Sequence, residues 1–342
     1  MITTPERQGQ SQALASLGAC LRDAGLTPRA LAAWAGTARI AALLARLDRM
    51  PARPATPADA ILALLVAGAE VARDRLRARP ALIDALAAHQ LVEQGGDQLR
   101  ARVAILPLGQ ALLVCDRIDA PVERARVCWP DDSSHHLATA IPPGRRADWL
   151  DLGCGSAFAP LARPELATRI TGIDINERAV RYAQLGAGLS GISHLAAVPG
   201  DAGGAHEPAE LVTCNAPIPE PMPEPPHPDH VPAAAHRSPA PLTEIWRQAE
   251  PGWFDRLWPA LGRSVRPGGM IVVHAATEAI LPVLEGAAGE RVVVTYTPAS
   301  VRGFAVAWWR PDAPDRFVAV HRALGPDRPH LDPRDREDVL AG

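Results

Sequence analysis

The sequence predicts an α/β protein with a doubly wound, mostly parallel sheet, preceded by a mainly helical domain. Three observations predict it. From about residue 148, apolar strand-like runs alternate with helical patterns, which requires crossover helices on both faces of a parallel sheet. The first run leads into a Gly-x-Gly turn at Gly153 and Gly155. The second run ends on an acidic residue, Asp174.

Length and composition limit the possible classes of protein. At 342 residues, two domains are expected. We expect a helical, winged-helix-like N-terminal cap domain over 1–130, the α/β domain over 131–322 and a loosely ordered tail over 323–342. The formal net charge is −3 and no long basic run is present, so nucleic acid is not an expected partner.

Cysteine usage and hydropathy exclude further classes. The five cysteines lack C-x-x-C spacing, so neither a metal site nor a disulfide framework is expected. No apolar run approaches the ~18 residues of a membrane span, and no signal peptide is recognisable. These features predict a cytoplasmic protein without a membrane partner.

The first 90 residues carry helical spacing with clear start signals. Thr27–Pro28 and Thr56–Pro57 each place a threonine at the N-cap ahead of a proline at the first helical position. Pro80 opens a further helix, 81–91, which runs toward Gly95–Gly96.

Two strands should follow that glycine pair, at 99–106 and 111–115. Helices followed by such a hairpin resemble a winged helix. Contact with nucleic acid is one interpretation; covering a cleft or forming a homodimer is the other, and the charge balance favours the second.

The α/β part begins with a strand that ends at Asp151. Further strands are predicted at 169–174, 194–199, 210–214 and 270–274, with a helix at 177–189. The last two strands, 291–295 and 304–309, lack an intervening helix and should form an antiparallel edge hairpin. One more short apolar run, 317–320, follows.

Ligands of such sheets bind outside the carboxyl ends of the strands, where the glycine turn and Asp174 lie. Glycines let the main chain approach a ligand, and the next helix turns its N–H groups toward an anion. A carboxylate after the second strand accepts hydrogen bonds from a ribose diol. Phe158 replaces the third glycine of a dinucleotide fingerprint, so a nucleoside cofactor without a pyrophosphate is favoured.

The run Asp151-Leu152-Gly153-Cys154-Gly155-Ser156 resembles motif I of the class I S-adenosylmethionine-dependent methyltransferases. Three further family motifs follow in order, at 200–202, 211–217 and 265–269. The resemblance implies a seven-stranded Rossmann-like sheet, S-adenosylmethionine as cofactor and S-adenosylhomocysteine as product. It also implies the cofactor-binding residues, namely Asp151, Gly153, Cys154, Gly155, Asp174, Ile175, Asp201, Ala202 and Asn215.

The fourth motif, Asn215-Ala216-Pro217-Ile218, resembles the N-P-P-[YFW] motif of the ribosomal RNA guanine and release-factor glutamine methyltransferases. In that group the asparagine binds the acceptor amine and the aromatic ring stacks on it. Here the asparagine and Pro217 remain, but Ile218 replaces the aromatic residue. We therefore expect Asn215 to bind a non-planar acceptor; alternatively it bonds only cofactor or backbone.

Other candidates come from two polar segments. Ser134, His135 and His136 precede the first strand, where the resemblance implies a pocket; His135 or His136 could act as general base, or all three could form a solvated helix cap. The proline-rich stretch 216–243 reads as a lid or a disordered loop. Its Glu220 and His230 could bind a substrate amine or take its proton, and Trp246 could wall the pocket.

These features together predict a methyltransferase that acts on nitrogen or oxygen of a small molecule, possibly in secondary-metabolite biosynthesis. One alternative keeps the fold but catalyses a non-methylating displacement, such as ring closure within the substrate. The other is an RNA or protein amide N-methyltransferase that contacts its target through the N-terminal domain.

Overall fold

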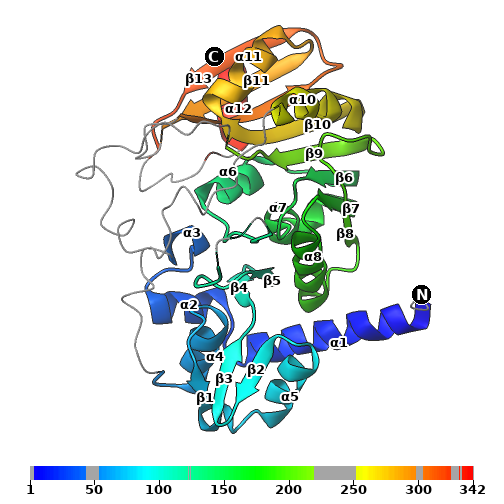
Figure 1. Cartoon of the computed structure of the whole chain (residues 1–342). Coiled ribbons are helices and arrows are strands. Elements are labelled where there is room, and N and C mark those ends of the chain that lie inside the picture. The colour runs from blue at the N-terminus through cyan, green and yellow to red at the C-terminus, as the bar shows by residue number, and fades with distance from the viewer. Residues whose placement is uncertain are drawn as a thin grey trace. The chain divides into compact units, whose positions relative to one another are not determined.

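The computed structural model describes residues 4–43, 54–121, 123, 125–218, 252–297, 303–324, 331 and 333–341 (Figure 1). Two compact units make up the chain. Unit 1 holds Met1–Asp131, Gly155–Ala162 and Arg178–Ala196. Unit 2 holds Asp132–Cys154, Arg163–Glu177 and Ala197–Gly342. Short segments of the α/β sequence are thus grouped with the N-terminal unit.

Three helices of unit 1, α2, α4 and α5, start at the prolines Pro28, Pro57 and Pro80, as the sequence predicts. The helical elements in the N-terminal part of this unit are α1 (Thr4–Asp23), α2 (Pro28–Ala35), α3 (Ile40–Leu43), α4 (Pro57–Leu65), the 3₁₀ turn η2 (Arg73–Leu76) and α5 (Pro80–Ala88). Thr27 caps α2 by accepting the Ala30 N–H. Thr56 and Asp59 form a reciprocal capping box at α4.

Unit 1 contains two small antiparallel sheets. The first has the order β1-β3-β2 and is built from β1 (Val71–Ala72), β2 (Val92–Gly95) and β3 (Gln98–Ala101). The second pairs β4 (Ala104–Leu108) with β5 (Ala111–Cys115). The single strand predicted over 99–106 is therefore wrong: the chain bends at Arg102, whose N–H donates to the Leu91 carbonyl.

Helix α8 (Glu177–Ser190) organises the rest of unit 1, together with the short α7 (Phe158–Ala162). The Ser190 hydroxyl oxygen accepts the Leu112 N–H at 2.9 Å, which ties α8 to β5. The buried Asp116 carboxylate accepts the Tyr182 hydroxyl of α8 at 2.8 Å and the Val127 N–H at 2.7 Å. The segment after β5 is thereby fixed to α8.

Unit 2 is built on an eight-stranded sheet with the order β13-β11-β12-β10-β9-β6-β7-β8. Its strands are β6 (Arg146–Leu152), β7 (Ala167–Asp174), β8 (Leu195–Pro199), β9 (Ala209–Asn215), β10 (Val265–Ala276), β11 (Glu290–Tyr296), β12 (Phe304–Arg310) and β13 (Arg316–His321), with a 3₁₀ turn η3 (Pro164–Leu166) before β7. The strands β6, β7, β9 and β10 are mutually parallel, and β12 runs antiparallel to β10 and β11.

This sheet confirms the predicted α/β class and the predicted antiparallel pairing of the strands β11 and β12. The hairpin is not the edge of the sheet, however, because β13 pairs in parallel outside β11. The short apolar run at 317–320 was not expected to be a strand of this sheet.

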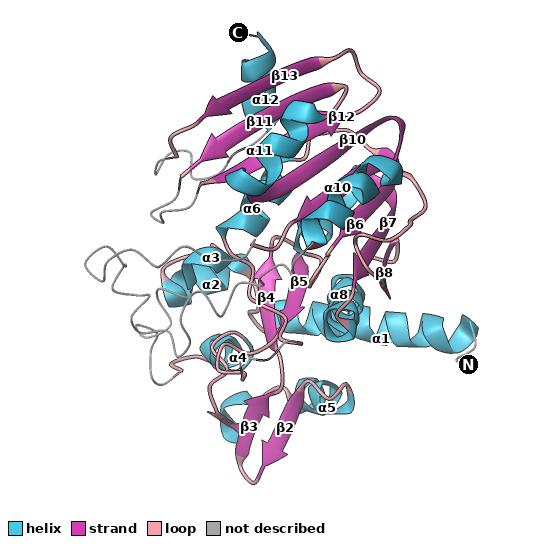
Figure 2. Ribbon diagram, turned by 45° about the horizontal axis from the view of Figure 1, so that its top comes forward, coloured by secondary structure: helices cyan, strands magenta, loops and turns pink. Residues whose placement is uncertain are grey.

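The two faces of the sheet bury different side chains. Helices α10 (Trp253–Ser264) and α11 (Thr277–Gly286) lie against one face, as Figure 2 shows, over an apolar core that includes Val212 and Ile271. Helix α6 (Asp132–Ala140) contacts β9, β10 and β12. The Trp308 indole N–H of β12 donates to the Ala140 carbonyl of α6 at 2.8 Å.

The described residues of the C-terminal segment contact α6, β11 and β13. The N–H of the buried Leu331 donates to His136 Nδ1 at 3.1 Å, and its carbonyl accepts the Thr139 hydroxyl at 2.7 Å. Helix α12 (Pro333–Ala341) contacts β11 and β13. None of the helices within the described ranges has the length and apolar composition needed to cross a bilayer.

Candidate functional site

The turn after β6 has the backbone that its two glycines predict. Gly153 has a φ of +68° and Gly155 a φ of +54°, a left-handed conformation that side chains disfavour. Among the described residues, a Cβ atom placed on either glycine would meet nothing within 4 Å. The Cys154 N–H donates to the Ile173 carbonyl at 2.9 Å and fixes the turn to β7. None of the described residues therefore occupies the position that a side chain on Gly153 would take.

The cysteines near this turn are packing residues. A Cβ on Gly172 would lie 2.8 Å from Cys154 Sγ, so the thiol occupies the space that the β7 glycine leaves. Burial raises the pKa of both the Cys154 and Cys214 thiols above the ordinary value. Both therefore stay protonated near neutral pH and are unsuited to act as nucleophiles.

Asp174 and Ile175 form an unusual pair at the carboxyl end of β7. Asp174 is 6% exposed and its Oδ1 accepts the Asn176 N–H at 2.8 Å. The next side chain, Ile175, is 62% exposed, and Val198 at the end of β8 is 41% exposed. These two are the large apolar side chains that the described part of the chain leaves most open to solvent. A buried carboxylate beside exposed apolar surface suits a ligand with both hydroxyls and a flat apolar ring.

Asp201 and Ala202 follow β8 and occupy different environments. Asp201 Oδ1 accepts the Gly203 N–H at 2.9 Å, and its other oxygen lies 3.9 Å from Arg256 Nε. Ala202 is buried and belongs to the apolar core under α10. Of the two, the structure leaves Asp201 the more accessible to a ligand.

Asp151 is a buried carboxylate at the end of β6. The Trp149 indole N–H donates to Thr213 Oγ1 at 2.7 Å, and the Thr213 hydroxyl in turn donates to Asp151 Oδ1 at 2.6 Å. Burial raises the pKa of Asp151 to about 7, against the lowering effect of the Thr213 hydrogen bond. The group can therefore gain or lose a proton near neutral pH.

Asn215, at the carboxyl end of β9, lies at the centre of a chain of side-chain hydrogen bonds. Its Nδ2 donates to Ser133 Oγ of α6 at 2.8 Å. Its Oδ1 lies 2.9 Å from Nδ1 of the buried His274, which is its direct neighbour across β9 and β10. His274 Nε2 lies 2.6 Å from the Tyr296 hydroxyl.

The position of each proton in these hydrogen bonds follows from the chemistry of the groups that form them. Asn215 Oδ1 can only accept, so His274 Nδ1 carries the proton, and Nε2 accepts the Tyr296 O–H. Burial lowers the pKa of His274 to about 3, so the ring stays neutral at neutral pH. We call Tyr296, His274, Asn215 and Ser133 the Asn215 relay.

The histidines expected before the first strand lie on α6. His136 is buried, and it accepts the Leu331 N–H. Its ring packs against Tyr296 with the centroids 4.3 Å apart and the ring planes tilted by 37°. The Nδ1 atom of His136 therefore helps to anchor the C-terminal segment, and the general-base role of this ring stays a prediction. His135 and Ser134 are half-buried on the same helix, and the residue that meets Asn215 is their neighbour Ser133.

Of the remaining candidate site residues, the structure describes one and does not describe the other three. Pro217 is the second residue after β9, and the Ala216 N–H between them donates to the His274 carbonyl at 2.8 Å. Glu220, His230 and Trp246 lie outside the described residues. Sequence reasoning missed His274 and Tyr296, since a single histidine or tyrosine in an apolar strand usually indicates core.

Comparisons with known proteins give fold-level likeness only. No family model matches the chain, and no curated protein matches it. Among solved structures, a tRNA methyltransferase of M. jannaschii is 14% identical with a TM-score of 0.39, and the match covers 62% of this chain and 60% of that one. A 16S rRNA methyltransferase of T. thermophilus, solved with AdoMet and guanosine, is 16% identical with a TM-score of 0.41, covering 65% and 47%.

A third structure, from Streptococcus mutans in complex with SAH, is 13% identical with a TM-score of 0.36, covering 52% of this chain and 95% of that chain. The chain thus spans less than two thirds of the first two proteins. At such values, neither activity nor substrate follows from the likeness.

Proposed function

We propose that this chain binds S-adenosylmethionine at the carboxyl ends of β6, β7 and β8 and transfers its methyl group to a nitrogen of a small molecule. The observation that carries the proposal is the pair formed by buried Asp174 and 62% exposed Ile175. Together with the open main chain at Gly153, this pair offers a carboxylate, an apolar surface and uncovered backbone at one edge of the sheet.

Each part of the cofactor finds a residue of fitting chemistry. The Asp174 carboxylate would hold the ribose hydroxyls, Ile175 would cover one face of the adenine, and Asp201 would meet its amino edge. The turn at Gly153 would receive the methionine part. When bound, the cofactor supplies a methyl group that the positive charge of its sulfonium has already activated.

The protein's own contribution to the reaction is positioning, which can supply ~7–11 kcal/mol when the reacting atoms are held near attack geometry. A carbonyl oxygen has two acceptor positions, and His274 uses one at Asn215 Oδ1. The second would accept an N–H of the acceptor amine and orient its lone pair. As the N–CH₃ bond forms and the S–CH₃ bond breaks, the nitrogen releases a proton to water.

The surroundings of Asn215 favour a small non-planar acceptor. Ile218 is buried, so it offers no stacking surface to a planar base. The net charge of −3 gives no general attraction for a phosphate backbone. We accordingly expect a small-molecule partner and neither nucleic acid nor membrane.

The proposal is tested with methyl-labelled S-adenosylmethionine and separated cell fractions. We expect S-adenosylhomocysteine to accumulate and label to enter the small-molecule fraction as a product heavier by one methyl group. The Asn215→Ala variant should still bind S-adenosylhomocysteine but transfer no label. Label in RNA or protein, or an unmethylated cyclised product, would contradict the proposal and support one of the alternative reactions.

A further inference from the structure

The C-terminal segment of unit 2 reaches α6, the helix that carries Ser133 at one end of the Asn215 relay. Leu331 is 1% exposed, and its N–H donates to His136 Nδ1 of α6 at 3.1 Å. The Leu331 carbonyl oxygen lies 2.7 Å from the Thr139 hydroxyl of the same helix. A second carbonyl of α6 also lies 2.7 Å from this hydroxyl, so its single proton is shared between the two. The bond to His136 is therefore the main link between Leu331 and α6.

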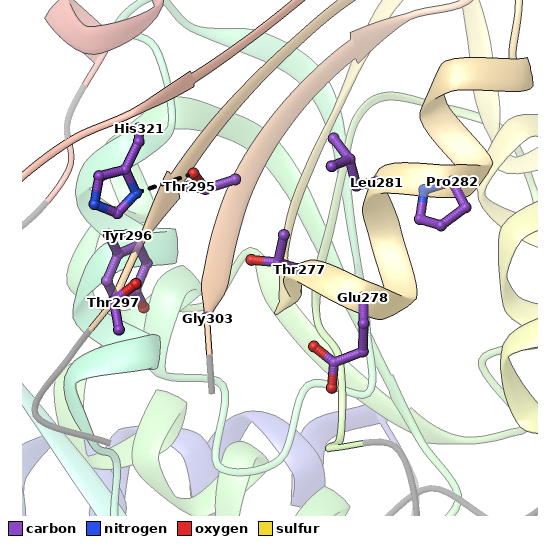
Figure 3. A pocket seen from close by; sticks show the side chains of 9 residues that line it. All are labelled: Thr277, Glu278, Leu281, Pro282, Thr295, Tyr296, Thr297, Gly303 and His321. Atoms are coloured by element: carbon purple, nitrogen blue, oxygen red, sulfur yellow. Dashed lines mark hydrogen bonds between the residues drawn. The ribbon is translucent and has the colours of Figure 1, made fainter. Parts of the chain in front are cut away.

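His136 connects this link to the relay through ring packing. Its ring centroid lies 4.3 Å from that of Tyr296, and its plane is within 7° of the His274 ring at a centroid distance of 6.2 Å. Figure 3 shows Tyr296 at the end of β11, where it lines a pocket of about 400 Å³. The Tyr296 ring, whose hydroxyl bonds to His274, is thus held in part by His136.

Helix α6 presents Ser133 to Asn215 from its first turn. Ser133 Oγ accepts a proton from Asn215 Nδ2 at 2.8 Å, and at the other end of the helix the Ala140 carbonyl accepts the Trp308 indole N–H. With 9 residues, α6 is too short to be stable alone, so its place depends on such contacts. Ser133 and His136 are three residues apart and share one face of the helix. The bond between Leu331 and His136 therefore helps to fix the turn that carries Ser133.

Leu331 is in turn held by α12. This helix begins at Pro333, and two residues of extended chain span at most ~7 Å. Arg336 of α12 forms an ion pair with Glu290 of β11, and both side chains are largely buried. Removal of one partner from such a pair is strongly destabilising, because the other charge is left without compensation. The docking of α12 on β11 therefore limits where Leu331 can lie.

We propose that Leu331 and 333–341, the C-terminal strap, position α6 so that Ser133 holds the Asn215 amide in one orientation. Arg336 fastens the strap to the sheet, and His136 joins the strap to α6, so both are positioning residues that act through Ser133. That this orientation matters for methyl transfer rests on the proposed function. The strap can be loosened at Arg336 without a change to any residue at the carboxyl ends of β6, β7 and β8.

The Asn215 amide can be observed directly, because the chain has only two asparagines, Asn176 and Asn215. Labelling of asparagine with nitrogen-15 gives two side-chain NH₂ signal pairs in NMR spectra of the full chain, and the Asn176→Asp variant identifies the pair of Asn215. We expect one Nδ2 proton of Asn215 to be shifted downfield by its bond to Ser133. This measurement needs neither cofactor nor substrate.

Two variants loosen the strap at different points. His136→Phe keeps a ring against Tyr296 but removes the acceptor of the Leu331 N–H, and Arg336→Ala removes the ion pair of α12. Both should move the Asn215 signal toward the position of a free amide. Glu337→Gln is the control, since Glu337 is an exposed residue on α12, and it should leave the signal unchanged.

Steady-state kinetics tests whether the strap matters for the reaction. His136→Phe should lower kcat about tenfold or more, and Arg336→Ala about threefold or more, with the KM for S-adenosylmethionine within about twofold. His136→Asn separates the strap from a general base. The asparagine oxygen can replace Nδ1 as an acceptor but cannot take up a proton as a base, so this variant should recover much of the rate.

The outcomes separate the strap from the reaction. An unchanged Asn215 signal in folded His136→Phe or in Arg336→Ala would overturn the strap, even if the Tm falls. A His136→Asn variant as slow as His136→Phe would also overturn it and support the general base. Movement of the Asn215 signal in both variants, with no methyl transfer by the parent chain, would leave the strap in place and contradict only the proposed function.

Discussion

His274 Nδ1 lies 2.9 Å from Asn215 Oδ1, and the two residues are paired across β10 and β9. This contact fixes which way the Asn215 amide faces, since its Nδ2 is directed at the same time to Ser133. His274 does not reach solvent, so we regard it as a positioning residue that acts through Asn215. Predictions for both catalysis and stability follow from this geometry.

The His274→Leu variant should lower kcat about 10- to 100-fold, because the Asn215 amide loses its fixed orientation. The KM for S-adenosylmethionine should stay within about twofold, since the cofactor residues lie on other strands. Steady-state kinetics measures both. His274→Gln keeps an N–H donor and should recover part of the rate, and Tyr296→Phe should have a milder effect. A rise in KM with unchanged kcat would contradict the positioning role.

The stability of the folded protein should fall at acidic pH because His274 is buried in its neutral form. Burial lowers the pKa of His274 to about 3, whereas histidine in the unfolded chain titrates near 6.5. The folded state therefore binds fewer protons than the unfolded state between these values, and stability falls as the pH falls through this window. We expect the Tm to drop between pH 7 and pH 5, and to drop less in His274→Gln. Equal slopes for the two proteins would contradict the burial of a neutral ring.

The contribution of Asp151 to protein stability should depend on pH in the opposite direction. Burial raises its pKa from 3.8 to about 7, so the folded state holds a proton that the unfolded state releases. Stability is therefore lost as the pH rises from about 4 to about 7. Asp151→Asn still accepts the Thr213 hydroxyl and should gain roughly 1–3 kcal/mol at pH 8 and little at pH 4.

Asp148 provides the control, because it is a buried acid on the same strand that lies 2.5 Å from an Arg266 nitrogen and also pairs with Arg169. Asp148→Asn should lower the Tm at pH 8, since it leaves two arginines without their partner. Denaturation curves at both pH values compare the variants. Destabilisation by Asp151→Asn at pH 8 would contradict the cost assigned to its buried charge.

Sequence patterns predicted the parallel strands of unit 2 because buried strands read as apolar runs bounded by glycine, proline and acids. They could not predict β13, a half-exposed strand whose alternation is weak, nor the bend at Arg102, where no glycine or proline marks a break. The positions of Asp174 and Asn215 at strand ends were predictable from local motifs.

The Asn215 relay was not predictable in the same way. It depends on which strands are neighbours, because His274 reaches Asn215 through strand register and Tyr296 through ring packing around β12. The bond between the Leu331 N–H and His136 Nδ1 was likewise not predictable, because the two residues lie far apart in the sequence.

Ile175 should contribute to binding with little effect on folding. Its side chain is 62% exposed, so Ile175→Ser removes little packing and should leave the Tm nearly unchanged. If adenine covers this side chain, the same change should weaken S-adenosylhomocysteine binding about tenfold, as expected for loss of part of a buried isoleucine. Ile175→Leu is the conservative control and should bind like the parent. Unchanged affinity in Ile175→Ser would place the adenine elsewhere.

The most direct measurement is calorimetric titration of the full chain and of Asp174→Ala with S-adenosylmethionine and S-adenosylhomocysteine. We predict saturable one-site binding of both ligands to the parent chain, and at least about 100-fold weaker binding to Asp174→Ala, because two hydrogen bonds to a carboxylate are lost. Absence of heat with either nucleoside, or parent-like binding by Asp174→Ala, would contradict a nucleoside site at the end of β7.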